Sequence, residues 1–344
     1  MGDTDAVVYS PMSESRAFRF VRRCGFALVT FSAALWLLTT ICFFGVWDQV
    51  AAITTFPQWS WAIIGILTAA VAWRLLRPRT RIPFLLFGLW LLATLCFADN
   101  LLPVIRGIIH GSTQSSRAPQ GTFRVVTLNC ASSTSAAGEV VKFQPDIVLL
   151  QESPASNKVA ELAREFFGDS ASFVAGFDCA IISRYPLKTI DKRPTIHSAR
   201  AVLILPEKRE LLVTSLRLTP PLGRTDLWNP AAWHAYREDR RLRRRELGSV
   251  LEAESATTEL PEILGGDFNA PAGDAIYKLL HDYRDSHRTA GRGWGNTALN
   301  TIPAFRPDQI WLRRLSAVSS HGVRTVHSDH RMVVTDVLLN PNEQ

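Results

Sequence analysis

The chain has 344 residues, enough for two or three domains, and 38 Lys and Arg against 31 Asp and Glu give it a formal net charge of +7. Most of this charge lies near the N-terminus, because residues 1–117 carry a net charge of +5 and residues 118–344 only +2. The composition therefore excludes a strongly basic C-terminal part, the kind that binds duplex nucleic acid through its surface charge.

Three apolar stretches come first along the chain. Residues 24–47 and 49–73 contain no charged side chain, and each is long enough to cross a bilayer, which takes about 20 residues. Residues 82–98 form a shorter uncharged stretch that continues past Asp99 and Asn100, so we expect a third span whose far end reaches the membrane interface. A signal peptide would have one apolar core of about 7–15 residues instead of three in series.

The arginines around these stretches predict an orientation in the cytoplasmic membrane. Four precede the first span and four lie between the second and the third, whereas the loop between the first and the second contains Asp48 and no Lys or Arg. The eight are Arg16, Arg19, Arg22, Arg23, Arg74, Arg77, Arg79 and Arg81. By the positive-inside rule, three spans place everything after about residue 110 on the extracytoplasmic face. If the third span does not cross, the C-terminal part stays in the cytoplasm.

The stretches divide the chain into four predicted parts. They are a cytoplasmic segment (1–23), a membrane domain (24–110), a small-polar linker (111–121) and an α/β domain (122–344). The last part contains Cys130 and Cys179, which could form one disulfide but are more simply interpreted as buried thiols. Without a Cys/His cluster, nothing indicates zinc.

The α/β domain has many short strand patterns and few helical ones. Apolar, β-branched runs predict strands at 123–128, 147–150, 180–183, 201–205, 211–216, 263–264, 309–312 and 332–339. Helical spacing predicts helices at 157–167 and 230–254, the second entered through Asn229 as its N-cap and Pro230 in its first turn. The excess of predicted strands over predicted helices favours packed sheets over a single doubly wound sheet.

The second of these helices contains a run of charge, REDRRLRRRE, at residues 237–246. Such a run could bind a phosphate backbone or an anionic lipid surface. The more common arrangement is an amphipathic helix whose charged face is solvated while Leu247, Val250 and Leu251 pack inward.

Polar residues stand at several predicted strand ends where a turn alone does not require them. In chain order they are Asn129, Glu152, Asp267, Asn269, Asp329 and His330. Strand ends on one edge of a sheet converge, so we expect these side chains to form one site. Each residue alone is a weak signal, since Asp and Asn favour turns for local reasons, but the ordered set is specific.

These residue types suit phosphoester chemistry assisted by Mg²⁺ or Mn²⁺, because hard oxygen ligands predominate. Mg²⁺ is typically held by one or two carboxylates and a substrate phosphate, and Glu152 and Asp329 can supply the carboxylates. Asp267 could orient or deprotonate the attacking water. Asn269 could donate a hydrogen bond to a phosphoryl oxygen, and His330 could stabilise the charge that develops on the phosphate.

In their order, the motifs of residues 122–344 resemble the endonuclease/exonuclease/phosphatase family, which has the deoxyribonuclease-I-like fold. They are TLN, PDIVLLQE, AIISRYP, GDFN, PDQIW and SDH. The resemblance implies a four-layer α/β sandwich, in which two mixed β-sheets lie face to face with helices outside, here preceded by about three transmembrane helices. It also implies metal-dependent cleavage of phosphoester bonds.

The resemblance further implies roles for single residues. Glu152 matches the family's metal-binding carboxylate, with Asn129 beside it in reach of metal and phosphate, and Asp308 matches the acid that orients the last histidine. The other matches are Asp267 to the water-orienting acid, Asn269 to the phosphate-contacting amide, and Asp329 and His330 to the terminal SDH.

One position departs from the family pattern. Many members carry a histidine in the middle strand followed by a proline, where this chain has Leu216-Arg217-Leu218-Thr219-Pro220. Arg217 cannot donate a proton near neutral pH, but it can bind a phosphate with two hydrogen bonds. Alternatively, it is a surface charge on an edge strand.

Three functions are compatible with these features. The one we favour is a membrane-anchored, divalent-metal-dependent phosphodiesterase acting as a nuclease. The second is a phosphodiesterase or phosphatase for phosphoinositide or sphingomyelin lipids, and the third is a non-catalytic membrane protein that retains the fold. The expected partners are a phosphoester substrate and the bilayer, with no protein partner indicated. Substrate choice is expected to depend on the long segments 220–233 and 285–300.

Overall fold

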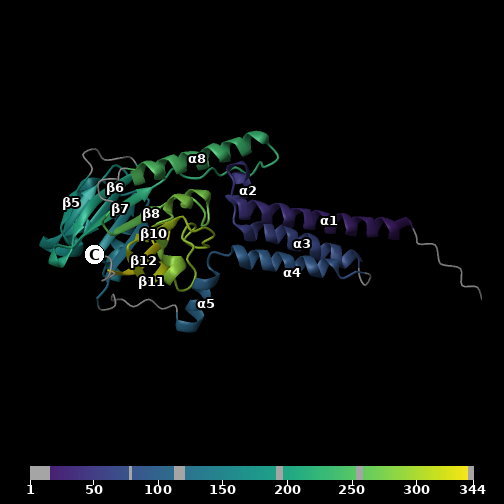
Figure 1. Ribbon diagram of the computed structural model, residues 1–344, viewed down its shortest axis with the longest axis horizontal. Helices are drawn as coiled ribbons and strands as arrows, with labels where there is room; N and C mark the ends of the chain where they lie inside the picture. The colour runs from purple at the N-terminus through teal and green to yellow at the C-terminus, as the bar shows by residue number, and fades with distance from the viewer. Residues whose placement is uncertain (1–15, 77–79, 112–120, 191–196, 253–258, 340–344) are drawn as a thin grey trace, which may run out of the picture. The chain divides into compact units, whose positions relative to one another are not determined.

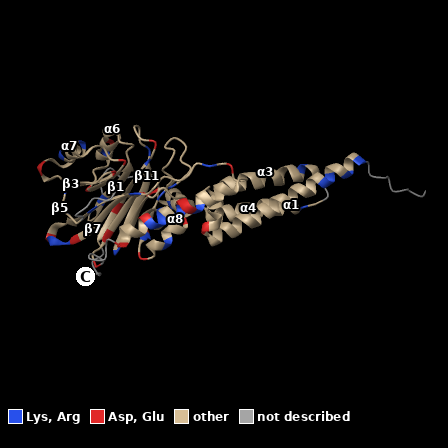
Figure 2. Cartoon of the chain, turned by 90° about the horizontal axis from the view of Figure 1, so that it is seen from above, with Lys and Arg blue, Asp and Glu red and all other residues tan. Residues whose placement is uncertain are grey.

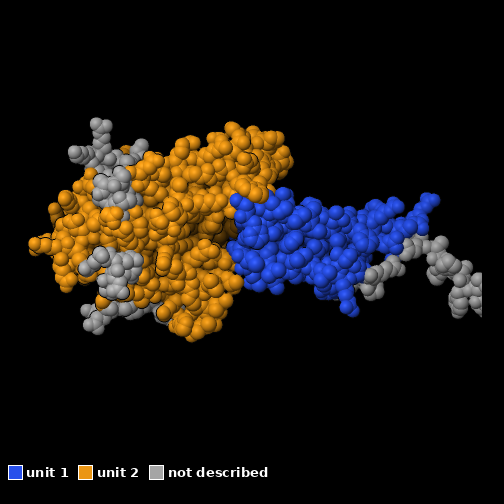
Figure 3. Space-filling view, viewed as in Figure 1, with its two compact units in different colours: residues 1–45, 58–97 blue, residues 46–57, 98–344 orange. Residues whose placement is uncertain are grey.

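The computed structural model describes residues 16–76, 80–111, 121–190, 197–252 and 259–339. Arg77, Arg79 and most of the predicted linker lie outside these ranges. The chain divides into two compact units, one within residues 1–45 and 58–97 and the other within residues 46–57 and 98–344 (Figure 3). The second unit thus includes two segments that the sequence predicted as parts of the membrane domain.

The described part of the first unit consists of apolar helices, namely α1 (Arg16–Gly45), α3 (Gln58–Leu76) and α4 (Ile82–Phe97), whose ribbons are almost free of charge in Figure 2. Helices α1 and α3 are each long and apolar enough to cross a membrane, and α4 qualifies only together with α5 (Leu101–His110). Ser32 joins the three helices of this unit: its Oγ donates to the Gly65 carbonyl at 2.9 Å and accepts from Trp90 Nε1 at 3.1 Å. Small residues and buried hydroxyls of this kind suit helix packing in lipid.

The helices begin and end differently from the predicted spans. Residues 49–54, predicted as part of the second span, form together with Asp48 the short helices η1 (Asp48–Val50) and α2 (Ala51–Thr54), which belong to the second unit. Asp99, expected at the membrane interface, accepts a hydrogen bond from Arg306 Nε at 2.5 Å. A carboxylate with a buried arginine partner is satisfied within the protein, which the apolar pattern of the stretch could not reveal.

The second unit contains two mixed sheets of six strands each (Figure 1). The strand orders are β11-β12-β1-β2-β4-β3 and β5-β6-β7-β8-β10-β9. Their bounds are β1 Phe123–Asn129, β2 Ile147–Gln151, β3 Ser172–Ala175, β4 Cys179–Ser183, β5 Leu187–Thr189, β6 Ser198–Ile204, β7 Glu210–Arg217, β8 Glu262–Asp267, β9 Arg284–Asp285, β10 Asp308–Arg313, β11 Leu315–Val323 and β12 Met332–Leu339. All eight predicted strands are present, whereas β3, β5, β9 and β11 were not predicted because they are short or rich in polar residues.

Short helices and two longer ones cover the sheets. They are α6 Thr134–Gly138, η2 Glu139–Phe143, α7 Ser156–Phe167, η3 Gly168–Ser170, η4 Pro206–Lys208, α8 Pro230–Glu252, η5 Ala275–Leu280 and α9 Ser286–Ala290. The predicted helices at 157–167 and 230–254 correspond to α7 and α8, and residues 253–254 lie outside the described ranges. Cys130 and Cys179 are both free and buried.

Strand alternation builds the layers of the second unit. Val125 of β1 and Ile263 of β8 pack together between the sheets, whereas Val126 faces the cluster under α6 and α7 and Leu264 faces the cluster under α8 and η5. Helices therefore cover the outer faces of two sheets that pack face to face. The predicted four-layer α/β sandwich is confirmed.

Helix α8 buries part of its charge run. Leu247 and Val250 are buried as predicted, but so are the side chains of Arg240 and Arg243. Arg240 donates to Asp274 Oδ2 at 3.0 Å, to Thr54 Oγ1 at 2.6 Å and to the Trp47 carbonyl at 3.1 Å. The run is therefore not only a solvated face, because residues 46–57 lie on it and supply acceptors.

Candidate active site

The polar strand ends meet at one edge of the sandwich. The parallel pairs β1–β2 and β7–β8 end there, and β4, β10 and β12, which are antiparallel to their neighbours, begin there. Asn129 lies on the face of β1 that carries Val125, and Asp267 on the face of β8 that carries Ile263, so both point toward the facing sheet. Asn129 Nδ2 donates to Asp267 Oδ2 at 3.0 Å and thereby joins the two sheets.

Two glycines bring β8 close enough for this contact. A Cβ at Gly265 would lie 2.6 Å from Leu149 Cδ1 of the facing sheet. Gly266 has φ +146°, and a Cβ there would lie 1.9 Å from the Leu216 carbonyl oxygen. Position 266 therefore requires glycine, and a side chain at position 265 would displace Leu149. The GGD sequence thus places the carboxylate of Asp267, which is 1 % exposed, inside the edge of the sandwich.

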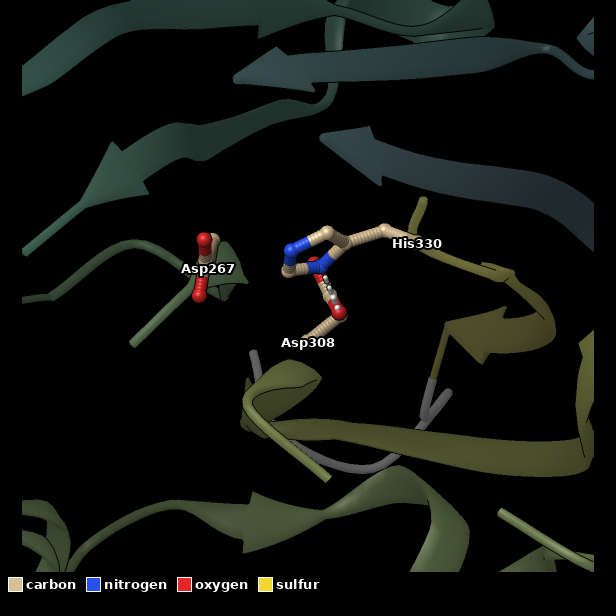
Figure 4. Close-up of side chains that lie close together, drawn as sticks. All are labelled: Asp267, Asp308 and His330. Carbon is tan, nitrogen blue, oxygen red and sulfur yellow. Dashed lines mark hydrogen bonds and ion pairs between the residues drawn. The ribbon is translucent and has the colours of Figure 1, made fainter. Parts of the chain in front are cut away.

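Asp267, Asp308 and His330 form the centre of the site (Figure 4). Asp308 is the direct cross-strand partner of Asp267. His330 Nδ1 lies 2.8 Å from Asp308 Oδ2, and in Figure 4 the other ring nitrogen faces Asp267. Thr297 Oγ1 also donates to Asp308 Oδ2 at 2.5 Å. One ligand atom from each of the three residues lies within 4.8 Å of the others.

Burial and close charges shift the pKa values at this centre. Burial, followed by the nearby Asp308 carboxylate, raises the pKa of Asp267 to about 6. Burial opposes the charged form of His330, but the carboxylates of Asp308, Asp267 and Asp329 outweigh it and raise its pKa to about 10. Near neutral pH, the centre therefore combines an ionised Asp267 with a protonated His330.

Glu152 lies beside this centre and is held by two donors. Asn129 Nδ2 donates to Glu152 Oε1 at 3.1 Å, and Arg217 Nη2 donates to the same oxygen at 2.7 Å. Arg217 Nη1 also donates to Asp178 Oδ2 at 2.8 Å. Because β7 lies between β6 and β8, the interpretation of Arg217 as a charge on an edge strand is wrong.

Sequence reasoning missed Asp178. It directly precedes β4, which begins at the same edge as the other site residues, and it follows the apolar residues 173–177, which include most of the unpredicted strand β3. The available clue was an acid between two apolar runs, residues 173–177 and the strand β4.

Comparison with known proteins identifies the family. Residues 126–330 match the Endonuclease/Exonuclease/phosphatase family. The chain belongs to this family. The match extends over all the predicted site residues, from Asn129 to His330. No curated protein matches the chain.

Solved structures share the fold at low sequence identity. A functionally unknown conserved protein from Enterococcus faecalis V583 is 16% identical, with a TM-score of 0.50 over 63% of this chain and 100% of that one. An endonuclease/exonuclease/phosphatase from Bacteroides vulgatus is 15% identical, with a TM-score of 0.49 over 64% and 99% of the two chains. A Bacteroides thetaiotaomicron VPI-5482 mannosyl-6-phosphatase is 13% identical, with a TM-score of 0.48 over 63% and 99%.

The two remaining predicted site residues, Asn269 and Asp329, differ in their contacts with the catalytic centre. The Asn269 backbone N–H donates to Asp267 Oδ1 at 2.9 Å, and its Nδ2 donates to the Leu218 carbonyl at 2.7 Å, which leaves one amide hydrogen for a substrate. Asp329 is exposed, and within the described ranges its side chain makes no hydrogen bond to Glu152 or Asn129. Hydrogen bonds thus join Asn129, Glu152 and Asp267, whereas the Asp329 carboxylate acts on His330 through its charge.

The donor set fits a divalent metal ion of the kind the family uses. Two carboxylates and an imidazole converge at Asp267, Asp308 and His330, with Glu152 adjacent. Asp308 Oδ1 is buried and has no hydrogen-bond partner among the described residues. A buried acceptor without a donor is costly, and a cation at this position would satisfy it. The geometric cluster therefore differs from the predicted ligand set of Glu152, Asp329 and Asn129.

Proposed function

We propose that this chain is a divalent-metal-dependent phosphoester hydrolase held at a membrane. The observation that carries the proposal is the buried arrangement of Asp267, Asp308 and His330 at the edge of the sandwich, with Asn129 joining Asp267 to Glu152. Turns alone would not bury two acids and a histidine next to one another, because each acid loses hydration there.

In the proposed reaction, water is the nucleophile and Asp267 is its base. The water oxygen forms a bond to phosphorus, the bond from phosphorus to the leaving oxygen breaks, and the water proton passes to Asp267. With a pKa raised to about 6, Asp267 is ionised at neutral pH yet more basic than an ordinary aspartate. Asn129 and the Asn269 backbone fix its two oxygens.

His330 would donate a proton to the leaving oxygen and neutralise charge on the phosphate, while Asp308 holds its ring in place. A bound Mg²⁺ or Mn²⁺ would polarise a phosphoryl oxygen. Glu152, Asp329 and Asn129 are the predicted ligands of the ion, and the carboxylates of Asp267 and Asp308 converge beside Glu152. His330, which carries a proton on each ring nitrogen in this reaction, would not bind the ion. A contact of Arg217 with the substrate phosphate stays a prediction.

Chelation tests the metal requirement. We expect EDTA to lower hydrolysis of bis(p-nitrophenyl) phosphate by the full-length protein in detergent by about 100-fold or more, and added Mg²⁺ or Mn²⁺ to restore it, because the ion stabilises transition-state charge. The measurement is the initial rate of p-nitrophenolate release. Full activity in EDTA, in protein shown to be metal-free by elemental analysis, would contradict the proposal.

We further propose that the catalytic domain lies on the extracytoplasmic face. Residues 46–57 connect two candidate spans, α1 and α3, and pack on α8 of the catalytic domain. Ala51 and Ala52 are buried there with Tyr236, and Arg244 makes two hydrogen bonds to Asp48, at 2.6 and 2.9 Å. A loop between two spans lies on one side of the membrane, so the domain that it contacts shares that side. The positive-inside rule assigns this side to the exterior.

Reporter fusions test this topology. Alkaline phosphatase, which folds only outside the cytoplasm, is expected to be active when fused after Leu339 and inactive when fused after Arg81. Because residues 46–57 contact the catalytic domain and share its side, the chain must cross the membrane once more after α3. Helix α4, with or without α5, would make this crossing. An active fusion after Arg81 and an inactive one after Leu339 would refute the assignment.

A further inference from the structure

An open pocket lies next to the catalytic centre. Its volume is about 780 Å³, and two segments around residues 299–302 and 324–329 line it. Asp329, which directly precedes His330, belongs to its wall. Anything bound in this pocket therefore lies beside the proposed position of the substrate phosphate.

Hydrogen bonds fix the two segments to each other and to the centre. Asn300 Nδ2 donates to the Thr325 carbonyl at 2.8 Å and to the Ser328 carbonyl at 2.9 Å. The Asn300 backbone N–H donates to the Asp329 carbonyl at 2.8 Å, and Thr325 Oγ1 donates to the His330 carbonyl at 2.6 Å. The pocket is therefore a built feature with a fixed position relative to His330.

The pocket exposes apolar side chains on this polar frame. Leu299 is 59 % exposed, Ile302 is 78 % exposed and Val326 is 76 % exposed. Leu299 also has φ +64°, a left-handed conformation that is uncommon for leucine. Single exposed apolar residues are ordinary, but several that line one pocket at a catalytic centre mark a binding surface for an apolar group.

Exposed apolar residues continue from the pocket toward α5. Trp294 is 48 % exposed, and its Nε1 donates to the Pro303 carbonyl, next to Ile302, at 3.1 Å. The Gly293 backbone N–H donates to the Pro103 carbonyl of α5 at 2.8 Å. Helix α5 begins four residues after α4 ends and exposes Leu102, Ile105, Ile108 and Ile109.

A lipid chain suits these exposed apolar side chains, because α5 follows the apolar helix α4 in the sequence. Arg106 holds α5 on the catalytic domain through the carbonyls of Arg288, Thr289 and Gly291.

We propose that the pocket of Leu299, Ile302 and Val326 binds the hydrocarbon part of an amphiphilic phosphoester whose phosphate lies at Asp267 and His330. The inference rests on the proposed function and names its substrate class, a lipid-like phosphoester instead of nucleic acid. Among the described residues that line the pocket, Arg324 is the only cation, whereas a groove that binds nucleic acid follows the phosphate backbone with many cations.

A series of alkyl p-nitrophenyl phosphates tests the proposal, because the ethyl, butyl and octyl esters share one leaving group and differ only in chain length. Used as monomers with the full-length protein and Mg²⁺, they are expected to show kcat/KM rising by about 100-fold from ethyl to octyl, mostly through KM. In Ile302→Glu and Leu299→Asn the ratio of kcat/KM for the octyl ester to that for the ethyl ester should fall to below about 10. Asn is chosen at position 299 because it tolerates the left-handed conformation.

Leu338→Glu is the matched control. Leu338 is 38 % exposed and lies near the end of β12 that is remote from His330, so this variant should keep the wild-type ratio. A wild-type ratio near one would overturn the pocket assignment while ethyl ester hydrolysis still supports the proposed function. Faster cleavage of a DNA oligonucleotide, insensitive to Ile302→Glu, would overturn it in favour of a nuclease. Absence of hydrolysis of every ester with either metal would overturn the proposed function and this inference with it.

Discussion

Replacing Asp267 with Asn is expected to lower kcat/KM for phosphoester hydrolysis by about 1000-fold or more. The substitution keeps the shape of the side chain but removes the charge and the basicity on which proton abstraction from water depends. Asp267 is 1 % exposed and both of its oxygens accept hydrogen bonds, so no water or neighbouring acid can easily take its place. The measurement is the initial rate on ethyl p-nitrophenyl phosphate with saturating Mg²⁺.

Asp282→Asn is the matched control for this change. Among the described residues Asp282 forms an ion pair with its neighbour His281, and its side chain is 70% exposed, so the same loss of charge should change the rate by less than about twofold. Thermal unfolding of both variants shows whether the fold is intact. An Asp267→Asn protein that folds and retains more than about a tenth of the wild-type rate would remove Asp267 from the proposed mechanism.

Replacing Arg240 with Met is expected to lower the free energy of unfolding of the second unit by about 3–5 kcal/mol. Arg240 and Asp274 are a fully buried ion pair, with 0% exposure of both side chains. The substitution leaves the Asp274 carboxylate buried without its cation and removes the donor to Thr54 and Trp47. We expect the midpoint of thermal unfolding in detergent to fall by roughly 6–20 °C.

Arg241→Met is the control one position along α8. The Arg241 side chain is 41% exposed and pairs with Glu238 and Asp48, so its loss should cost less than about 1 kcal/mol. Equal melting temperatures for the two variants would contradict the interpretation that a buried arginine attaches residues 46–57 to the catalytic domain.

Local patterns predicted much of the site. A strand shows itself by an apolar run, and a polar residue at its end stands out because no packing requires it there. This is how Asn129, Glu152 and Asp267 were found, and Asp267 and Asn129 indeed meet at 3.0 Å. Asp178 was missed because β3, which ends three residues before it, was not predicted as a strand. The partners of Arg217 were not predictable either, because Glu152 and Asp178 come from the other sheet.

The sequence by itself determined the apolar helices, most of the strands and the residues of the catalytic centre, because hydrophobic periodicity and motif order are local properties of the chain. The tertiary structure alone decided which of these segments belong together. Arg240 of the charge run meets Thr54 of an apolar stretch across 186 positions, and Asn300 fixes the segment that ends beside His330. Such contacts depend on how the layers pack, and no local pattern records them.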